Sequence, residues 1–297
     1  MRGSWGCAGP SVCAQDAGPS GQRSRGLVAG EIGGFGLADD TGAAARFYDP
    51  LGLAADGAGN IYVADTQSHT IRKVVVSTGA VTTLAGTADM SGSADGTGAA
   101  ARFNNPYGMA LDGADHLYVA DTNNHTVRKV ALSSGAVTTV AGTPGVAGGI
   151  NGTDAAARFN YPASVVADGI GNLYIADFGS HTIRKVDVNT GTVTTVAGTT
   201  GLSGSTDGTG AGARFYAPSG VAADGAGHLY VKDSANHTIR KIDLANASVT
   251  TIAGVAGQTG VKLGLPGRLN IPRGIAALPT GEIFVTEERE NAILSLR

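Results

Sequence analysis

The sequence predicts an all-β fold, a single β-propeller built from four-stranded antiparallel blades. The first observation is a fixed repeat: Arg46, Arg102, Arg158 and Arg214 follow one another at intervals of 56 residues, and Arg268 follows after 54. A constant period of this length indicates a repeat architecture. The second observation is that each period holds short, β-branched-rich segments separated by turn residues, as strands are. Each period is therefore expected to form one small sheet.

The unit that runs from residue 102 to residue 142 shows the four predicted strands most clearly. They are residues 107–111, 116–120, 126–132 and 136–141. Asp112-Gly113 and Ser134-Gly135 supply tight turns between them. The second strand is apolar on both faces, whereas a sheet covered on one side only would alternate polar and apolar residues. Each sheet is thus expected to lie between two neighbours, as a propeller blade does.

Four strings in the second and third predicted strands resemble NHL repeats, which form β-propellers. They are NIYVADTQSHTIRKV from Asn60, HLYVADTNNHTVRKV from His116, NLYIADFGSHTIRKV from Asn172 and HLYVKDSANHTIRKI from His228. The resemblance covers residues 27–297. The fifth copy, EIFVTEERENAILSL, departs from the pattern, because Glu287 replaces the Asp, Asn291 replaces the His and no Arg-Lys pair follows.

The two ends of the repeat region predict how the ring closes. Residues 26–30 match the end of a fourth strand, and the chain stops after the third strand of the fifth unit. Pairing residues 27–30 beside residues 292–296 would complete the last blade and remove two free sheet edges. Counting units in this way predicts five blades. Because NHL propellers more often have six, a six-bladed ring is the alternative.

Composition and the first residues add few constraints. The formal net charge is −3 and the pI is about 6.0, which argues against nucleic acid and anionic membranes as partners. No stretch approaches the roughly eighteen apolar residues of a membrane span. Residues 1–26 are expected to be a disordered segment outside the propeller domain of residues 27–297, with Cys7 and Cys13 as incidental thiols.

The compartment is not fixed by the sequence. The resemblance to NHL propellers of bacterial type favours an extracellular or periplasmic location. Residues 1–26 nevertheless lack the apolar core of a signal peptide. A monomeric domain is expected.

One rim of the predicted ring carries the long loops. The connections between blades, such as residues 86–105, lie on the same rim as the turn between the second and third strands. Long loops on a rigid scaffold are where binding usually resides. An Asp and a His recur in each of these turns, and one pair per blade indicates a structural role in turn geometry or packing. These residues are Asp65, Asp121, Asp177, Asp233, His69, His125, His181 and His237.

Other recurring residues in the loops are also interpreted as structural. Asp39, Asp95, Asn151 and Asp207 lack the further oxygens of a calcium site, so an N-cap role before a short helical turn is favoured. Phe103 is expected to anchor the loop from below. The repeated arginines from Arg46 to Arg214 are expected to tie each loop to the neighbouring blade. Arg72-Lys73 and its repeats are interpreted as a solvated pair on an outward-facing strand.

Positions that differ between repeats are the candidates for partner binding. Aromatic and basic residues that break the repeat near the rim are typical of contact surfaces. These residues are Tyr48, Tyr107, Tyr161, Tyr216, Phe178, Lys232 and Arg273. The alternative interpretation is simple drift between the repeats.

The sequence favours a binding propeller over an enzyme. The upper ends of the innermost strands offer Leu51, Tyr107, Ala163, Ser219 and Arg273, without a cluster of carboxylates or imidazoles for a channel metal. No catalytic residue, metal ligand or cofactor is predicted. The predicted function is a scaffold that uses its long-loop rim for a protein or glycan partner. The alternatives are a metal-dependent lyase or hydrolase, lactonase-like, with its site at the channel, and a purely structural module.

Overall fold

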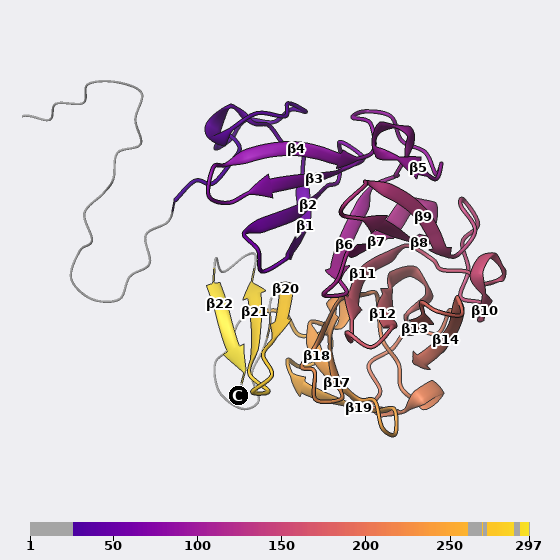
Figure 1. The fold of residues 1–297 in the computed structure, drawn as a ribbon. Coiled ribbons are helices and arrows are strands. Elements are labelled where there is room, and N and C mark those ends of the chain that lie inside the picture. Colours follow the sequence, from indigo (N-terminus) through magenta and orange to yellow (C-terminus); the bar gives the residue numbers. More distant parts are fainter. Residues whose placement is uncertain (1–25, 261–268, 270–271, 288–291, 297) are drawn as a thin grey trace, which may run out of the picture.

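Five blades surround a central channel in the computed structural model, which describes residues 26–260, 269, 272–287 and 292–296 (Figure 1). Every strand pair within a blade is antiparallel. The all-β propeller with five blades is therefore confirmed. Cys7, Cys13 and the expected disorder of residues 1–25 lie outside the described residues. In the part of the chain that the structure describes, no helix has the length and apolar character needed to cross a bilayer.

The main strands are named by blade, from the channel outwards. Blade one contains β1 (Pro50–Ala55), β2 (Asn60–Asp65), β3 (Thr70–Val75) and β4 (Ala80–Ala85). Blade two contains β6 (Pro106–Leu111), β7 (His116–Asp121), β8 (Thr126–Ala131) and β9 (Ala136–Ala141). Blade three contains β11 (Pro162–Ala167), β12 (Asn172–Asp177), β13 (Thr182–Asp187) and β14 (Thr192–Ala197). Blade four contains β16 (Pro218–Ala223), β17 (His228–Asp233), β18 (Thr238–Asp243) and β19 (Ser248–Ala253). Blade five contains β20 (Pro272–Ala277), β21 (Ile283–Glu287) and β22 (Ala292–Leu296).

Short elements decorate the loops between these strands. Two-residue strands pair with the outermost strand of blades two, three and four: β5 (Gly96–Thr97), β10 (Gly152–Thr153) and β15 (Gly208–Thr209). The long loops contain the 3-10 turns η1 (Gly42–Ala44), η2 (Gly98–Ala100), η4 (Asp154–Ala156) and η6 (Gly210–Gly212). The turns between second and third strands contain η3 (Thr122–Asn124), η5 (Phe178–Ser180) and η7 (Ser234–Asn236).

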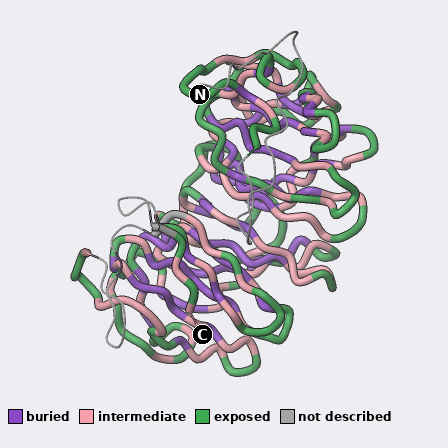
Figure 2. Tube along the Cα trace, turned by 90° about the vertical axis from the view of Figure 1, so that its left-hand side faces the viewer, coloured by how far each residue is buried: buried purple, intermediate pink, exposed green. Residues whose placement is uncertain are grey.

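The hydrophobic core is divided among the interfaces between blades. Each packed interface joins residues of one blade to residues of the next, and the buried residues are coloured purple in Figure 2. Between blades one and two, for example, Tyr62 and Ile71 pack against Phe103, Met109 and Leu117. Equivalent clusters join blades two and three, three and four, and four and five. The second strands of blades two, three and four, β7, β12 and β17, are covered on both faces because each lies inside two such interfaces, as the sequence predicted.

The interface between blade five and blade one differs from the other four. The cluster on blade one contains Val63, Val74 and Val81 but no described residue of blade five. Residues 27–30 lie against blade one, where the Gly30 N–H donates to the Gly42 carbonyl at 2.9 Å. The expected pairing of residues 27–30 with residues 292–296 is not present, because the described sheet of blade five is β20-β21-β22. We call this junction the seam; Figure 2 views the ring from the side that carries both ends of the chain.

Blade five is expected to be the least protected blade in hydrogen exchange. Its described sheet has three strands, and one of its faces lies at the seam, so its opening exposes less packed surface than that of any other blade. Amide exchange followed by mass spectrometry should show the fastest deuterium uptake in β20–β22. Equal protection around the ring would contradict this expectation. The turn at residues 288–290 and most of the loop before β20 lie outside the described residues.

Candidate functional site

The recurring Asp at the end of each second strand is buried and fully hydrogen-bonded. In blade two, Asp121 is not solvent-exposed. Its carboxylate accepts the Asn104 N–H at 2.8 Å, the Asn124 side-chain amide at 2.7 Å and an Nη1 hydrogen of Arg128 at 2.8 Å. This arrangement joins the incoming loop, the η3 turn and the third strand of one blade. The geometry agrees with the structural role expected for these aspartates.

The Arg of the third strand is buried, which corrects the expectation of a solvated Arg-Lys pair. Arg128 is fully buried, and its guanidinium bridges Asp121 and Asp95, the latter at 2.7 Å. It also lies over the Phe103 ring, 5.2 Å from the ring centroid. Lys129, the next residue in β8, is half-buried. Arg72, Arg184 and Arg240 repeat this burial and this stacking. Phe103 is fully buried, which confirms it as the anchor beneath the loop.

Asp95 does not cap a helical turn as expected. The N-cap position of η2 is Thr97, which makes no side-chain capping bond. The Asp95 carboxylate instead accepts hydrogen bonds from Arg128 and from the Thr139 N–H at 3.1 Å. The Asp95 oxygens are therefore already bound by donors of its own blade.

The arginine that marks the repeat fastens its own loop. Arg102 donates through Nη1 to the Ala101 carbonyl at 2.7 Å and to the Thr87 hydroxyl at 3.1 Å. It also donates to the Ala99 carbonyl in η2. Thr87 begins the connection out of blade one and Arg102 ends it, so the side chain closes the connection on itself. Arg102 was expected to connect its loop to a neighbouring blade. It instead connects the two ends of one loop.

Burial raises the pKa of the recurring aspartates although the arginines oppose this shift. The pKa of Asp121 is raised to about 6, and that of Asp177 to about 7, because each carboxyl is removed from water. The guanidinium beside each carboxyl lowers its pKa and so offsets part of the increase that burial causes. The position opposite Arg184 is Asn151 rather than an Asp, so blade three has one fewer negative charge around its arginine than blade two. A buried ion pair of this kind specifies geometry more than it adds stability.

Three of the four recurring histidines connect neighbouring blades. Each has a left-handed backbone conformation, with φ between 57° and 61° at His69, His125, His181 and His237. Nδ1 of His69, His125 and His181 accepts a backbone N–H from the start of the next blade, at 3.1 to 3.2 Å. An imidazole accepts such a bond only while Nδ1 is unprotonated. These contacts agree with the structural role expected for the histidines.

Acidification is therefore expected to weaken the contacts between blades. Burial lowers the pKa of His125 below its usual 6.5. Because the folded-state pKa is lower than that of the unfolded chain, this histidine contributes its full stability above about pH 6.5. That contribution is lost as the pH falls from this value through the folded-state pKa. His69 behaves in the same way.

Replacing His125 tests this expectation. His125→Ala should lower the melting temperature. His125→Asn is the sharper variant, because Asn tolerates a positive φ and does not titrate. The wild type should exceed this variant by about 1 kcal/mol in the free energy of unfolding at pH 8, with the gap closing towards pH 5. A gap that is independent of pH would show that the imidazole does not titrate in this range.

Four of the predicted binding residues are exposed aromatic residues of the long-loop rim, one in blade one, two in blade three and one in blade four. Tyr48, Tyr161, Phe178 and Tyr216 are 39–47% exposed. Two of them are held by histidines: the Tyr161 ring meets His125 edge-on at 4.5 Å between centroids, and the Tyr216 ring meets His181 at 5.5 Å. The turn that carries Phe178 is joined to the segment that carries Tyr161, because the Gly179 N–H donates to the Asn160 carbonyl at 2.7 Å. The sequence spacing of 36 and 35 residues did not reveal these His–Tyr pairs.

The remaining predicted binding residues lie elsewhere. Tyr107 is half-buried in β6 and lines the upper part of the channel. Lys232 is in β17 and is only 3% exposed. Arg273 belongs to β20, and its side chain lies outside the described residues.

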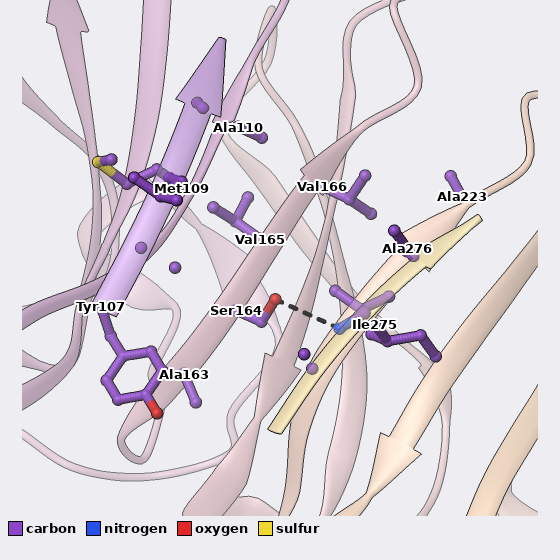
Figure 3. Close-up of a pocket in the computed structure, with 18 of the residues that line it drawn as sticks. Tyr107, Met109, Ala110, Ala163, Ser164, Val165, Val166, Ala223, Ile275 and Ala276 are labelled. Atoms are coloured by element: carbon purple, nitrogen blue, oxygen red, sulfur yellow. Dashed lines mark hydrogen bonds between the residues drawn. The ribbon is translucent and has the colours of Figure 1, made fainter. Parts of the chain in front are cut away.

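The channel is a cavity of about 630 Å³ lined by the innermost strands of all five blades (Figure 3). Its described lining is made of small and apolar residues, with Ser164, Ser219 and Tyr107 as the polar side chains. The Ser164 hydroxyl is itself occupied, since it accepts the Val221 N–H at 3.2 Å. Neighbouring strands approach closely because Gly108 has no side chain; a Cβ there would lie 2.6 Å from the Ser164 Cα. The described lining thus offers no carboxylate or imidazole.

The opposite rim carries Asp–His pairs that sequence reasoning missed. Nδ1 of His116 lies 2.8 Å from the Asp112 carboxylate, and Nδ1 of His228 lies 2.7 Å from that of Asp224. Asn172 makes the same contact to Asp168 in blade three. Since Asn replaces His without changing the contact, the pairs stabilise the tight turn. Among the described residues, no three His, Cys, Asp or Glu side chains are placed to hold a metal ion.

Comparison of the sequence with known proteins finds one repeat family. Residues 47–74, 103–130 and 215–242 match the model of the NHL repeat. The chain is 31% identical over 281 residues to Protein SUPPRESSOR OF QUENCHING 1, chloroplastic, of Arabidopsis thaliana, which covers 89% of this chain and 26% of that protein. It is 34% identical over 160 residues to NHL repeat-containing protein 2 of Bos taurus, which covers 50% and 22%. The chain thus spans about a quarter of the length of these relatives.

Solved structures share the fold at low sequence identity. The nidogen/laminin complex contains a similar chain, with a TM-score of 0.59 and 15% identity over 83% of this chain and 75% of that one. An auxiliary nutrient binding protein from Bacteroides thetaiotaomicron has a TM-score of 0.56 and 18% identity, over 84% and 69%. At these identities the likeness shows the propeller fold.

Proposed function

We propose that this protein, which carries NHL repeats folded into a β-propeller, is a non-catalytic binding platform whose long-loop rim takes a protein or glycan partner. The observation that carries the proposal is the exposure of four aromatic residues of this rim, Tyr48, Tyr161, Phe178 and Tyr216. Tyrosine supplies large contact area and a hydroxyl at low entropic cost, and it is enriched among residues that dominate binding energy. Exposed aromatic residues of this kind suit a shallow interface.

The structure beneath the exposed aromatic residues holds at least Tyr161 in position before a partner binds. The Tyr161 N–H donates to Nδ1 of His125, and its ring packs edge-on against the same imidazole. His125 belongs to the preceding blade, and the buried Asp121–Arg128 pair fixes the turn that carries it. Less side-chain freedom is then lost when a partner binds, which favours affinity.

The fold is compatible with both kinds of partner. One similar fold occurs in the nidogen/laminin complex and another in an auxiliary nutrient binding protein, and each binding property belongs to that protein. An aromatic ring can cover the apolar side of a sugar as readily as a peptide side chain, and the phenol can donate to either. The proposed surface consists of the four exposed aromatic residues. Tyr107 belongs to the channel lining and Lys232 is 3% exposed, so neither is part of this surface.

The side chains of the channel lining support a lyase or hydrolase less well than the exposed aromatic residues of the rim support a binding platform. A catalytic metal in proteins takes carboxylate, imidazole or thiolate ligands. The described lining supplies hydroxyl groups from Ser164, Ser219 and Tyr107, so the donor chemistry gives no specific support to an enzyme.

Two probe sets test the proposal: an array of immobilised oligosaccharides and a display library of random peptides. The wild-type chain should select related ligands from either the oligosaccharides or the peptides. This binding should persist at high salt because the four aromatic residues are uncharged. Selection of neither class, or turnover of lactones or esters by the purified chain, would contradict the proposal.

A further inference from the structure

Blade three differs from its neighbours at one residue beside its buried arginine. Blades one, two and four have an aspartate at this position: Asp39, Asp95 and Asp207. Each of them accepts an Nη2 hydrogen of the arginine at 2.6–2.7 Å and the backbone N–H of a threonine at 2.9–3.1 Å. Burial raises the pKa of Asp207, but the hydrogen bonds from Thr251 and Arg240 outweigh this effect and lower the pKa below its usual value. The position therefore suits a carboxylate.

Blade three has Asn151 at this position, and its amide oxygen makes the contacts. Oδ1 of Asn151 accepts an Nη2 hydrogen of Arg184 at 2.9 Å and the hydroxyl hydrogen of Thr195 at 3.0 Å. Because arginine can only donate, the amide atom that faces it is the oxygen. The other amide atom is a nitrogen, which cannot accept the Thr195 N–H as a carboxylate oxygen would. Asn151 thus supplies part of what the aspartates supply.

Gly152 follows Asn151, and the two form the one Asn-Gly pair of the sequence. An asparagine before glycine loses its amide most readily, because no side chain hinders attack of the next backbone nitrogen on the amide carbon. The fold favours glycine here, since a Cβ at residue 152 would lie 3.0–3.1 Å from main-chain atoms of Ala156 and Ala157. Asn151 is exposed, so water can reach it.

We propose that Asn151 is a self-processing site, at which the fold converts this asparagine to aspartate. The Gly152 nitrogen attacks Cγ of Asn151 and passes its proton to solvent. The Cγ–Nδ2 bond breaks, and the amide nitrogen takes up a proton and leaves as ammonia. One water then opens the cyclic imide at Cγ, and the Gly152 nitrogen regains its proton as its bond to Cγ breaks. The net reaction consumes one water and releases one ammonia. This inference is independent of the proposed rim function.

Arg184 and Thr195 favour both steps at the same carbon. In each step negative charge develops on Oδ1, and donors already placed at this oxygen stabilise such charge. Arg184 is fully buried, which strengthens its interaction with the developing charge. Attack of water on the main-chain carbonyl carbon of Asn151 would instead give isoaspartate, and neither donor contact involves that carbonyl. The folded chain should therefore yield mainly aspartate, which gives Arg184 the second carboxylate that the other blades have.

Incubation of the purified full chain, followed by peptide mass spectrometry, tests the proposal. Trypsin releases residues 130–158 as one peptide, in which Asn151 is the only asparagine. Its mass should rise by about 1 Da in ordinary water and by about 3 Da in water enriched in oxygen-18, because one oxygen comes from solvent. Synthetic peptides with aspartate or isoaspartate at position 151 identify the product by co-elution. The ratio of aspartate to isoaspartate should be at least about fivefold higher in the folded chain than in the chain unfolded in urea.

Matched variants separate the role of the fold from the reactivity of the Asn-Gly pair. Thr195→Val removes one donor to Oδ1 and should slow the conversion by about tenfold or more, whereas Thr195→Ser keeps the donor and should react as the wild type does. Asp95→Asn places the same pair in blade two, beside Arg128 and Thr139. The tryptic peptide of residues 74–102 should then gain aspartate in the same way. Circular dichroism verifies that each chain is folded.

Three results would overturn the proposal. A constant peptide mass in the folded chain would show that the fold protects Asn151. A product as rich in isoaspartate as that of the unfolded chain would show that the donors do not direct the hydrolysis. Equal rates for Thr195→Val and Thr195→Ser would show that the hydroxyl does not stabilise the oxyanion. If Thr195→Val does not fold, Asp95→Asn decides in its place, and a product without excess aspartate there would overturn the proposal as well.

Discussion

Replacing Arg128 by Met is expected to lower the free energy of unfolding by about 3–5 kcal/mol. The substitution keeps most of the apolar volume but removes the guanidinium that bridges Asp121 and Asp95. Asp121 has no exposure to water, so its carboxylate would remain buried without its cation. The Arg102 and Ala94 carbonyls would also lose a donor. Urea unfolding followed by circular dichroism gives the measurement.

Lys129→Met is the matched control for this substitution. It removes the same formal charge from the next residue of β8, which is half-buried rather than fully buried. Its effect should stay within about 0.5 kcal/mol. If both variants cost the same, the buried carboxylate left without its cation would not be the source of the loss.

Phe159→Ala is expected to destabilise the ring by about 3–5 kcal/mol, because it leaves a cavity beneath the loop that enters blade three. Phe159 is fully buried and packs among residues of blades two and three. Phe47 occupies the equivalent position in blade one but is only partly buried, and it lines an apolar cleft formed by that blade and the segment before it. Phe47→Ala should therefore cost roughly half as much or less.

Both variants make the same chemical change, so the difference between their losses in the free energy of unfolding compares the packing at two junctions of the ring. Both phenylalanines lie beneath an arginine, Arg184 at 5.4 Å and Arg72 at 5.2 Å, so that contact does not separate them. Equal losses in the free energy of unfolding would mean that the seam is as well packed in solution as the other interfaces.

The blades could be predicted from the sequence because their signals are local. The 56-residue period, the turn residues and the apolar second strand each lie within a short window. The register of Asp121 and His125 within the turn was predicted for the same reason. Their structural role agrees with the contacts that the structure shows.

The burial of the arginines could not be predicted in this way. A charged residue beside a lysine on a strand normally faces water. Arg128 is buried because its two acidic partners come from positions 7 and 33 residues earlier in the chain, and only the folded loop brings them together. A recurring Arg at fixed distances from two recurring Asp residues was the available signal. The His125–Tyr161 pair was hidden similarly, because its members belong to different blades.

The closure of the ring was predicted by counting strands. A strand count gives no information about the angle between successive blades. Counting assigned residues 27–30 to the last blade as its fourth strand. In the structure these residues contact blade one, as residues 84–86 contact blade two, but β22 does not pair with them. Whether two blades meet depends on the angle between successive blades, which is set by the close approach of their innermost strands rather than by any single motif.

The measurement that tests the central claim most directly is the affinity of the best selected oligosaccharide or peptide for three chains. They are the wild type, the rim variant Tyr161→Ala/Tyr216→Ala, and Ile170→Ala, which changes an exposed residue on the opposite rim. The rim variant should lose at least about 2 kcal/mol of binding free energy, roughly thirtyfold in affinity, with its free energy of unfolding nearly unchanged. Ile170→Ala should bind as the wild type does. Unchanged affinity in the rim variant, or a loss in Ile170→Ala, would contradict a binding surface on the long-loop rim.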